Sequence, residues 1–103
     1  MQAIQLQEFG GPEVLQIREI PRPDPGVGEL LVRVRAAAVN PVDTGIRSGG
    51  ASGLSGAMLP YVPGFDVSGV VTAIGPGVTE FDVGDEVFAM LSLRRGGAYA
   101  EYT

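Results

Sequence analysis

The sequence predicts an all-β fold, mainly strands with short helical turns, in a single domain that spans residues 1–103. The chain has the length of one ordinary domain, and 45% of its residues are apolar, which argues against disorder. Its 16 glycines and 8 prolines divide it into short segments and disfavour long helices. Several segments alternate apolar and polar residues with the period of two that is typical of half-buried strands.

The first two segments predict a β-hairpin. Residues 1–9 and 14–20 each alternate apolar with polar side chains, and Gly10, Gly11 and Pro12 lie between them, where the chain has to reverse. Prolines follow at positions 21, 23 and 25. Because each proline removes a backbone donor that a strand would need, this stretch is predicted to be a surface loop.

A half-buried strand is predicted for residues 29–39. Its two faces carry Leu30, Val32, Val34 and Ala36 on one side and Leu31, Arg33, Arg35 and Ala37 on the other. The carboxylate of Asp43 suits the unpaired amides at the start of a helix, so Asp43 is predicted to cap a short helical turn that ends at Arg47. Residues 48–57 are almost all Gly, Ser or Ala and are predicted to be mobile, since they offer little apolar surface to offset the cost of ordering them.

Three further strands are predicted in the second half of the chain. Residues 67–74 carry apolar side chains on both faces, which indicates a strand buried on two sides. Pro76 and Gly77 suit the centre of a type II turn, so the chain is expected to reverse there. Residues 86–93 and 98–103 alternate again and predict the last two strands.

Composition and charge exclude several classes of function. The net charge is -5, with seven arginines and no lysine, so the basic surface that nucleic-acid binding requires is missing. There is no apolar run of membrane-spanning length and no signal-peptide pattern, so no membrane partner and a cytoplasmic location are expected. The absence of cysteine and histidine excludes disulfides, thiol chemistry and an imidazole base.

Four segments carry a resemblance to a known family. They are Ala37–Asp43, Pro60–Val71, Phe81–Val87 and Gly97–Tyr102. In this order and spacing they resemble the first third of the medium-chain dehydrogenase/reductase superfamily, in its zeta-crystallin-like quinone oxidoreductase branch. The resemblance implies that residues 1–103 form a GroES-like, partly open β-barrel, the substrate-side domain of such a protein. It also implies that the chain is truncated before the nucleotide-binding Rossmann domain.

The glycines of this chain do not form a dinucleotide-binding fingerprint. After Gly75 and Gly77, the third glycine of such a fingerprint would stand at position 80, which is occupied by Glu80. Turns and close contacts between strands explain the glycines better. By the resemblance, NADPH is expected as a cofactor of the intact protein only.

The resemblance also implies that no zinc is bound. Zinc-dependent members of the superfamily carry a cysteine and a histidine as metal ligands at the positions of Asn40 and Phe65. An amide and a phenyl ring cannot replace thiolate and imidazole on zinc. The cysteine-rich lobe for structural zinc is missing as well, because Leu93–Gly96 runs directly into Gly97–Tyr99.

Asn40 and Pro41 are the predicted cofactor-binding residues. By the resemblance, the Asn40 side chain lies beside the nicotinamide and its ribose, where an amide can both donate and accept hydrogen bonds. The alternative is a turn residue before proline, which needs no ligand. Relatives commonly carry a tyrosine at the position of Gly45, so a roomier pocket is expected here.

Asp43, Ile46 and Phe65 are the predicted substrate-pocket residues. Asp43 either orders water or a substrate oxygen at the mouth of the cleft, or serves only as the helix cap. Phe65 either provides an apolar wall for a flat ring or is an ordinary core residue. Tyr61 and Tyr99 are interpreted as packing residues. No residue is identified as catalytic or as a convincing proton donor.

The function implied by the resemblance is metal-free hydride transfer from NADPH to a quinone or an α,β-unsaturated carbonyl. The 103-residue fragment is expected to be inactive alone, because the main binding surface for the cofactor is missing. The alternative is a stand-alone GroES-like binding or interaction module, either co-chaperonin-like or non-catalytic. Self-association into a homo-oligomer through an exposed sheet edge is a further expectation.

Overall fold

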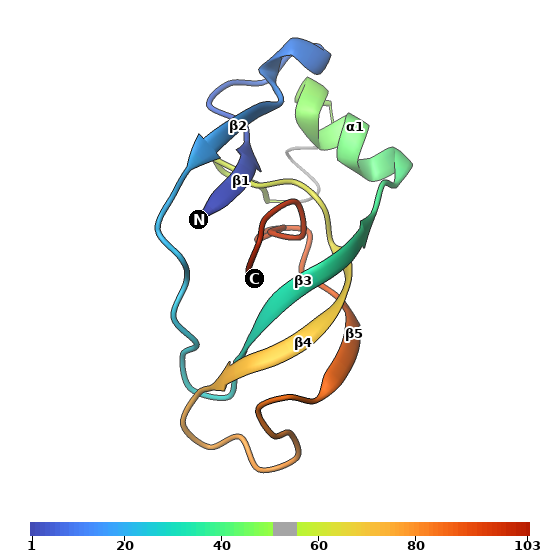
Figure 1. The fold of residues 1–103 in the computed structure, drawn as a ribbon. Coiled ribbons are helices and arrows are strands. Elements are labelled where there is room, and N and C mark those ends of the chain that lie inside the picture. Colours follow the sequence, from blue (N-terminus) through green and yellow to red (C-terminus); the bar gives the residue numbers. More distant parts are fainter. Residues whose placement is uncertain (51–55) are drawn as a thin grey trace.

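The fold consists of two antiparallel sheets and a single α-helix within residues 1–50 and 56–103, which the computed structural model describes (Figure 1). Part of the segment predicted to be mobile, residues 51–55, lies outside the described residues. The elements are β1 (Gln2–Gln5), the 3-10 helix η1 (Pro12–Val14), β2 (Gln16–Glu19), β3 (Leu30–Ala38), α1 (Pro41–Ser48), β4 (Asp66–Ile74) and β5 (Glu86–Met90). The predicted mainly-β class is confirmed, and the sheets are not closed into one continuous barrel.

The predicted hairpin is present as strands β1 and β2. They pair antiparallel from Gln2 opposite Glu19 to Gln5 opposite Gln16. Both strands are shorter than predicted, and Val14 belongs to η1 instead of the second strand. The reason is that the Val14 side chain is buried in the interior, where it packs in a cluster of buried side chains beneath helix α1.

Strand β3 departs from the simple alternation predicted for it. Leu31 and Val32 are consecutive in the chain, yet both are buried. The pairing with β4 shifts between these two residues and again between Val34 and Ala36, as a β-bulge does. A bulge sets two residues against one on the partner strand, so it turns neighbouring side chains to the same side. The predicted separation of β3 into two regular faces is therefore wrong.

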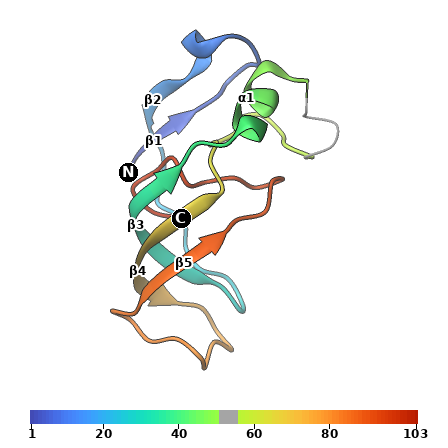
Figure 2. The ribbon, with the colours of Figure 1, turned by 90° about the vertical axis from the view of Figure 1, so that its right-hand side faces the viewer.

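Strand β4 lies between β3 and β5, and the three run side by side in Figure 2. Gly69 stands at its middle, where it pairs with Val34 on one side and Val87 on the other. A Cβ at Gly69 would overlap the carbonyl oxygen of Arg33. The turn after β4 is also present, because the N–H of Val78 donates to the carbonyl of Gly75 at 3.4 Å.

The last predicted strand, residues 98–103, is not a regular strand. It makes only isolated bridges, Ala100 with Ala3 and Tyr102 with Arg33. Its backbone nevertheless bonds to both sheets: Ile4 N–H donates to Tyr99 O at 2.8 Å, and Val32 N–H donates to Thr103 O at 2.7 Å. The segment thus lies between β1 and β3 (Figure 1) and joins the sheets at single points instead of extending one ladder.

Helix α1 packs over the hairpin end of the molecule. It ends at Gly49, whose φ of 91° is left-handed, a conformation that glycine adopts without a Cβ penalty. The N–H of Gly10 donates to Arg47 O at 2.9 Å, which ties the helix end to the hairpin loop. No helix among the described residues has the length and apolar composition to cross a membrane.

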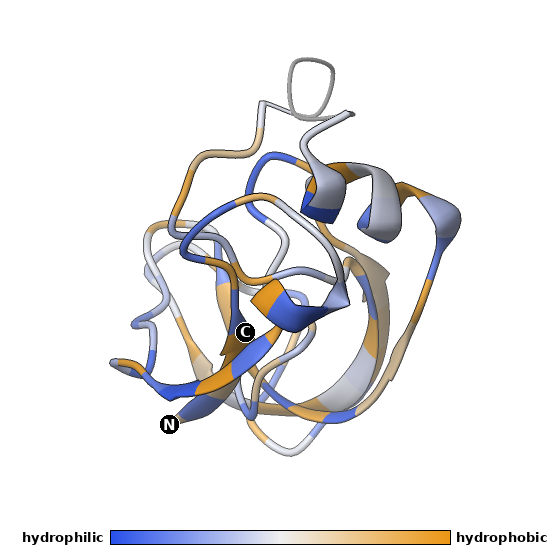
Figure 3. Ribbon diagram, turned by 90° about the horizontal axis from the view of Figure 1, so that it is seen from above, coloured by the Kyte–Doolittle hydropathy of each residue, from blue (hydrophilic) through white to orange (hydrophobic). Residues whose placement is uncertain are grey.

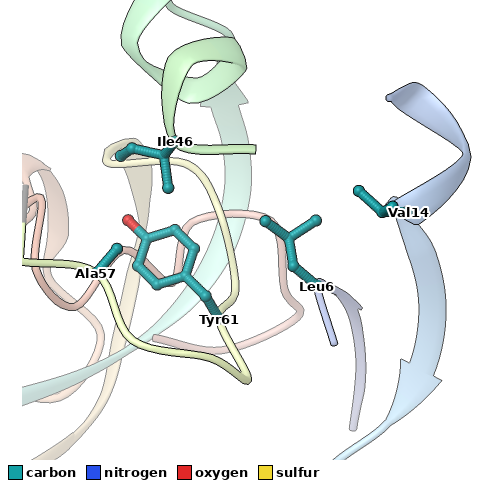
Figure 4. Close-up of a cluster of buried hydrophobic side chains, with 5 residues drawn as sticks. All are labelled: Leu6, Val14, Ile46, Ala57 and Tyr61. Carbon is teal, nitrogen blue, oxygen red and sulfur yellow. The ribbon is translucent and has the colours of Figure 1, made fainter. Parts of the chain in front are cut away.

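The main hydrophobic cluster lies between α1 and the N-terminal segment. Its buried members are Leu6, Val14, Ile46, Ala57 and Tyr61 (Figure 4). Along the rest of the chain hydrophobic and hydrophilic residues interchange at short intervals, as Figure 3 shows from above. The cluster therefore depends on residues that are distant in sequence and meet only in the fold.

Candidate functional site

Asn40 lies at the junction of β3 and α1. It is the N-cap of the helix, with extended φ and ψ of -120° and 156°, and Pro41 follows at the first helical position. The side-chain Nδ2 of Asn40 donates to Asp66 Oδ2 at 2.9 Å. The backbone N–H of Asn40 donates to Asp43 Oδ2, also at 2.9 Å. Both the peptide and the amide of Asn40 are therefore held by carboxylates.

Asp43 has a different role from the predicted cap. It lies inside the helix at the third position, and Asn40 is the N-cap. The prediction that Asp43 is the cap is thus wrong in position, although its carboxylate does bind a backbone amide at the helix start. A carboxylate at the third helical position can reach back to the N-cap amide, and Asp43 binds the N–H of Asn40 in this way.

Among the described residues, Asp43 is the one charged residue that is buried, with 5% of its surface exposed. Besides the Asn40 amide, it accepts a hydrogen bond at Oδ1 from the backbone N–H of Gly64, at 2.9 Å. The hydroxyl of Tyr99 lies 3.2 Å from Asp43 Oδ2 and donates to it. One carboxylate thereby contacts the start of α1, the segment before β4 and the C-terminal segment.

Tyr99 packs against Gly64, as its predicted role as a packing residue requires, and it also makes a polar contact with Asp43. Its ring lies against Gly64, where a Cβ would overlap it, and its hydroxyl is also 3.3 Å from Ala38 O. Burial, and then the charge of Asp43 and the hydrogen bond to it, raise the pKa of Tyr99 from 10.0 to about 12. A buried carboxylate requires hydrogen-bond donors, and this requirement is the signal from which Tyr99 could have been predicted as a partner of Asp43.

Tyr61 remains chiefly a packing residue, as predicted. Its ring belongs to the cluster beneath α1, and its hydroxyl donates to Leu93 O at 2.7 Å. Burial raises the pKa of Tyr61, and the charge of Asp43 raises it further. Asp43 thus disfavours the ionised form of both tyrosines.

Tyr99 gives the fold a pH dependence in the alkaline range. Below pH 10 both the folded and the unfolded chain keep the phenolic proton, so the contribution of Tyr99 to stability is complete. As the pH rises from about 10 to about 12, the unfolded chain loses the proton first, and the free energy of unfolding should fall. Denaturant unfolding at a series of pH values should show this fall, and Tyr99→Phe should make it shallower. An identical pH profile in Tyr99→Phe would contradict the assignment.

The remaining predicted site residues occupy different environments. Pro41 is exposed. Phe65 is 7% exposed. Ile46 is completely buried and belongs to the cluster beneath α1. These placements match the core alternative for Phe65 and place Ile46 in the interior as well. Contact of either residue with a substrate stays a prediction.

A hollow of about 500 Å³ lies beside the Asn40 and Asp66 pair. It is lined by Ala36, Ala37, Ala38, Asp66, Val67, Ser68, Phe88, Ala89 and Met90. Small side chains dominate on β3 and β4, whereas Phe88 and Met90 on β5 are 90% and 74% exposed. The hollow offers an apolar surface whose one charged group, Asp66, also binds the Asn40 amide.

The described residues contain no group of three or more histidine, cysteine, aspartate or glutamate side chains that could hold a metal ion. The two carboxylates around Asn40, those of Asp43 and Asp66, both accept hydrogen bonds from N–H groups of the chain.

Comparisons with known proteins identify the family. The family model for the alcohol dehydrogenase GroES-like domain matches residues 26–103. The quinone oxidoreductase of Lama guanicoe is 47% identical over 103 residues, which are 99% of this chain and 30% of that protein. The chain thus spans about a third of the length of the curated relatives that it matches.

Solved structures agree with that result. The quinone oxidoreductase from Coxiella burnetii has a TM-score of 0.91 and 36% identity, and covers 100% of this chain and 33% of its own. The Escherichia coli quinone oxidoreductase complexed with NADPH has a TM-score of 0.88 and 34% identity, over 100% of this chain and 30% of that one. The chain therefore belongs to the alcohol dehydrogenase GroES-like domain family, within the quinone oxidoreductase branch of the medium-chain dehydrogenases/reductases.

Proposed function

We propose that this chain forms the substrate side of an NADPH-dependent oxidoreductase that transfers a hydride, without metal, to a quinone or an α,β-unsaturated carbonyl. The observation that carries the proposal is the Asn40 amide, held by Asp66 beside the hollow on β3, β4 and β5. The similarity to named quinone oxidoreductases along 99% of the chain supports it. The nucleotide-binding part would come from a separate domain, which these 103 residues do not include.

The residues around Asn40 fit the nicotinamide end of such a cofactor. An amide side chain carries two N–H hydrogens and a carbonyl oxygen. Asp66 accepts one of the hydrogens and sets the orientation of the amide, which keeps further capacity for a ribose hydroxyl or a carboxamide. Pro41 is exposed at the first turn of α1, where it can pack against the same ligand. A bound NADPH would supply the hydride.

The acceptor is proposed to lie against apolar surface near this amide. Quinones and enones both present a carbonyl conjugated to a carbon–carbon double bond in a flat frame. Small residues such as Ala38 and Ser68 leave room for a flat ring, and Phe88 offers an exposed aromatic face. The chain contributes by positioning the acceptor, since holding two reactants in the reactive geometry lowers the barrier substantially.

The matched relatives favour the reductase over a stand-alone binding module. The relatives and structures reported above are oxidoreductases, and fold similarity alone does not carry the function of a co-chaperonin.

Self-association is a separate proposal. In the described sheet β5 is an edge strand, so its outer backbone groups can pair with the edge of a second copy.

A chimera tests the proposed function. Residues 1–103 would replace the matching part of the E. coli quinone oxidoreductase, and NADPH oxidation would be followed with a benzoquinone and with an enone. We expect turnover, and loss of the side-chain amide in Asn40→Ala should lower kcat/KM by about tenfold or more. The control is Gln16→Ala, which removes an exposed amide on β2 and should leave the rate unchanged.

Two results would contradict the proposal. One is a folded chimera that binds NADPH but reduces neither acceptor. The other is NADPH oxidation by the isolated 103-residue chain, which we expect to be inactive without a nucleotide-binding domain.

A further inference from the structure

We propose that Asp43 is the positioning residue of this site, and that its carboxylate holds the N–H of Asn40 and the N–H of Gly64, the residue before Phe65, in a fixed relation. This inference rests on the function proposed above, since it gives Asp43 a role for the residues that would face cofactor and substrate. Neither a helix cap nor a contact with water or substrate, the two roles predicted for Asp43, accounts for all of its contacts.

The geometry of the carboxylate carries the proposal. Oδ2 accepts from the N–H of Asn40 and Oδ1 accepts from the N–H of Gly64, both at 2.9 Å. Gly64 directly precedes Phe65, and it is 21 residues from Asp43 along the chain. Because both oxygens belong to one planar group, neither peptide can shift without straining the other bond. A local helix cap would use only the first of these contacts.

The burial of Asp43 indicates that this arrangement is not simply a source of stability. Its side chain is buried, and the partners that the structure gives it are two backbone amides and a phenol, with no arginine among them. Removing a carboxylate from water is costly, and a well-packed apolar residue often stabilises a fold at least as well as a buried charge. A buried charge satisfied by several donors does define one geometry.

Tyr99 completes the arrangement from the other side. Its ring covers Gly64, whose φ of 86° and missing side chain leave space for it. Its hydroxyl donates to Asp43 Oδ2, at the end of the carboxylate that binds Asn40. The ring thus shields the bond to Gly64 from water. Asp66 then orients the Asn40 side chain, so two aspartates hold the two ends of the same residue.

The chain contains a matched case that separates capping from positioning. Asp85 Oδ2 accepts from the N–H of Asp82 at 2.9 Å, across the same three-residue spacing as Asp43 and Asn40. That bond is exposed and lies in the turn before β5, away from Asn40. Asp85→Asn therefore repeats the local loss that Asp43→Asn causes, without touching the site.

The test compares three variants of the 103-residue chain by NMR: Asp43→Asn, Tyr99→Phe and Asp85→Asn. In Asp43→Asn, the backbone amide signals of Asn40 and Gly64 should both move upfield and exchange with solvent about tenfold faster, because a charged acceptor is lost. The side-chain amide signals of Asn40 should shift as well. Tyr99→Phe should move the same signals less, and Asp85→Asn should leave them in place.

The result that overturns the proposal is a folded Asp43→Asn whose Asn40 and Gly64 signals match the wild type, even if the chain is less stable. Should Asp43→Asn fail to fold, Tyr99→Phe decides: unchanged Asn40 signals overturn the proposal and shifted ones support it. These signals need neither cofactor nor turnover, so an inactive wild-type chimera would count against the proposed function alone. In an active chimera, Asp43→Asn should lower kcat by a larger factor than Asp85→Asn does.

Discussion

Replacing Ile46 by alanine is expected to lower the free energy of unfolding by about 2–5 kcal/mol. Ile46 is completely buried between α1 and the N-terminal segment, where it belongs to the same cluster as Leu6 and Tyr61 (Figure 4). The truncation removes apolar contacts and leaves a cavity that the surrounding backbone cannot close fully. Denaturant unfolding of the 103-residue chain measures the loss.

Two controls make the Ile46 result specific. Ile46→Val removes one methylene and should cost only about 0.5–1.5 kcal/mol. Ile17→Ala truncates an isoleucine that is 70% exposed on β2, so it should change stability by less than about 0.5 kcal/mol. A stable Ile46→Ala that weakens acceptor reduction in the chimera would instead place Ile46 in the substrate pocket, against the burial seen here.

Replacing Gly69 by alanine is expected to cost about 3 kcal/mol or more, and to prevent folding if the domain is only marginally stable. The added Cβ would overlap the carbonyl oxygen of Arg33 and come within 2.8 Å of a methyl of Val32. Both obstacles belong to β3, and β4 is paired on its other side with β5, so neither strand can move aside freely. Thermal and denaturant unfolding would show the loss.

Gly50→Ala is the matched control for this substitution. Its added Cβ would be 3.6 Å from the Ser48 hydroxyl, an ordinary contact, and its φ is not in the left-handed region. We expect a change within about 0.5 kcal/mol. If Gly69→Ala were as mild as Gly50→Ala, strands β3 and β4 would have to lie farther apart at this point than their paired backbones indicate.

Much of the fold was predictable because it depends on local pattern. Alternation at period two located the hairpin, and the apolar run 67–74 located the central strand, since both express which side chains must leave water. Pro76 fixes its own φ, and Gly77 readily adopts the positive φ that the third position of a type II turn needs, here 83°. The turn between β4 and β5 could therefore also be predicted. The family followed from short motifs whose spacing is visible in the chain itself.

The predictions that were wrong, for β3 and for residues 98–103, share a different physical origin. The bulges in β3 depend on the register with β4, and a register is a relation between two strands. Residues 98–103 carry a strand pattern, but they bond to β1 and β3 at isolated points because no single neighbour runs beside them far enough. Neither feature can be derived from one segment considered alone.

For the candidate site, the sequence by itself determined the residue types: an amide at Asn40, a phenyl ring at Phe65 and a carboxylate at Asp43. The tertiary structure alone decided how they are held. It brought Gly64 and Tyr99, distant in sequence, onto the Asp43 carboxylate. The physical reason is that a buried charge takes its partners from whichever donors the folded chain brings within hydrogen-bond distance, and sequence separation does not limit that choice.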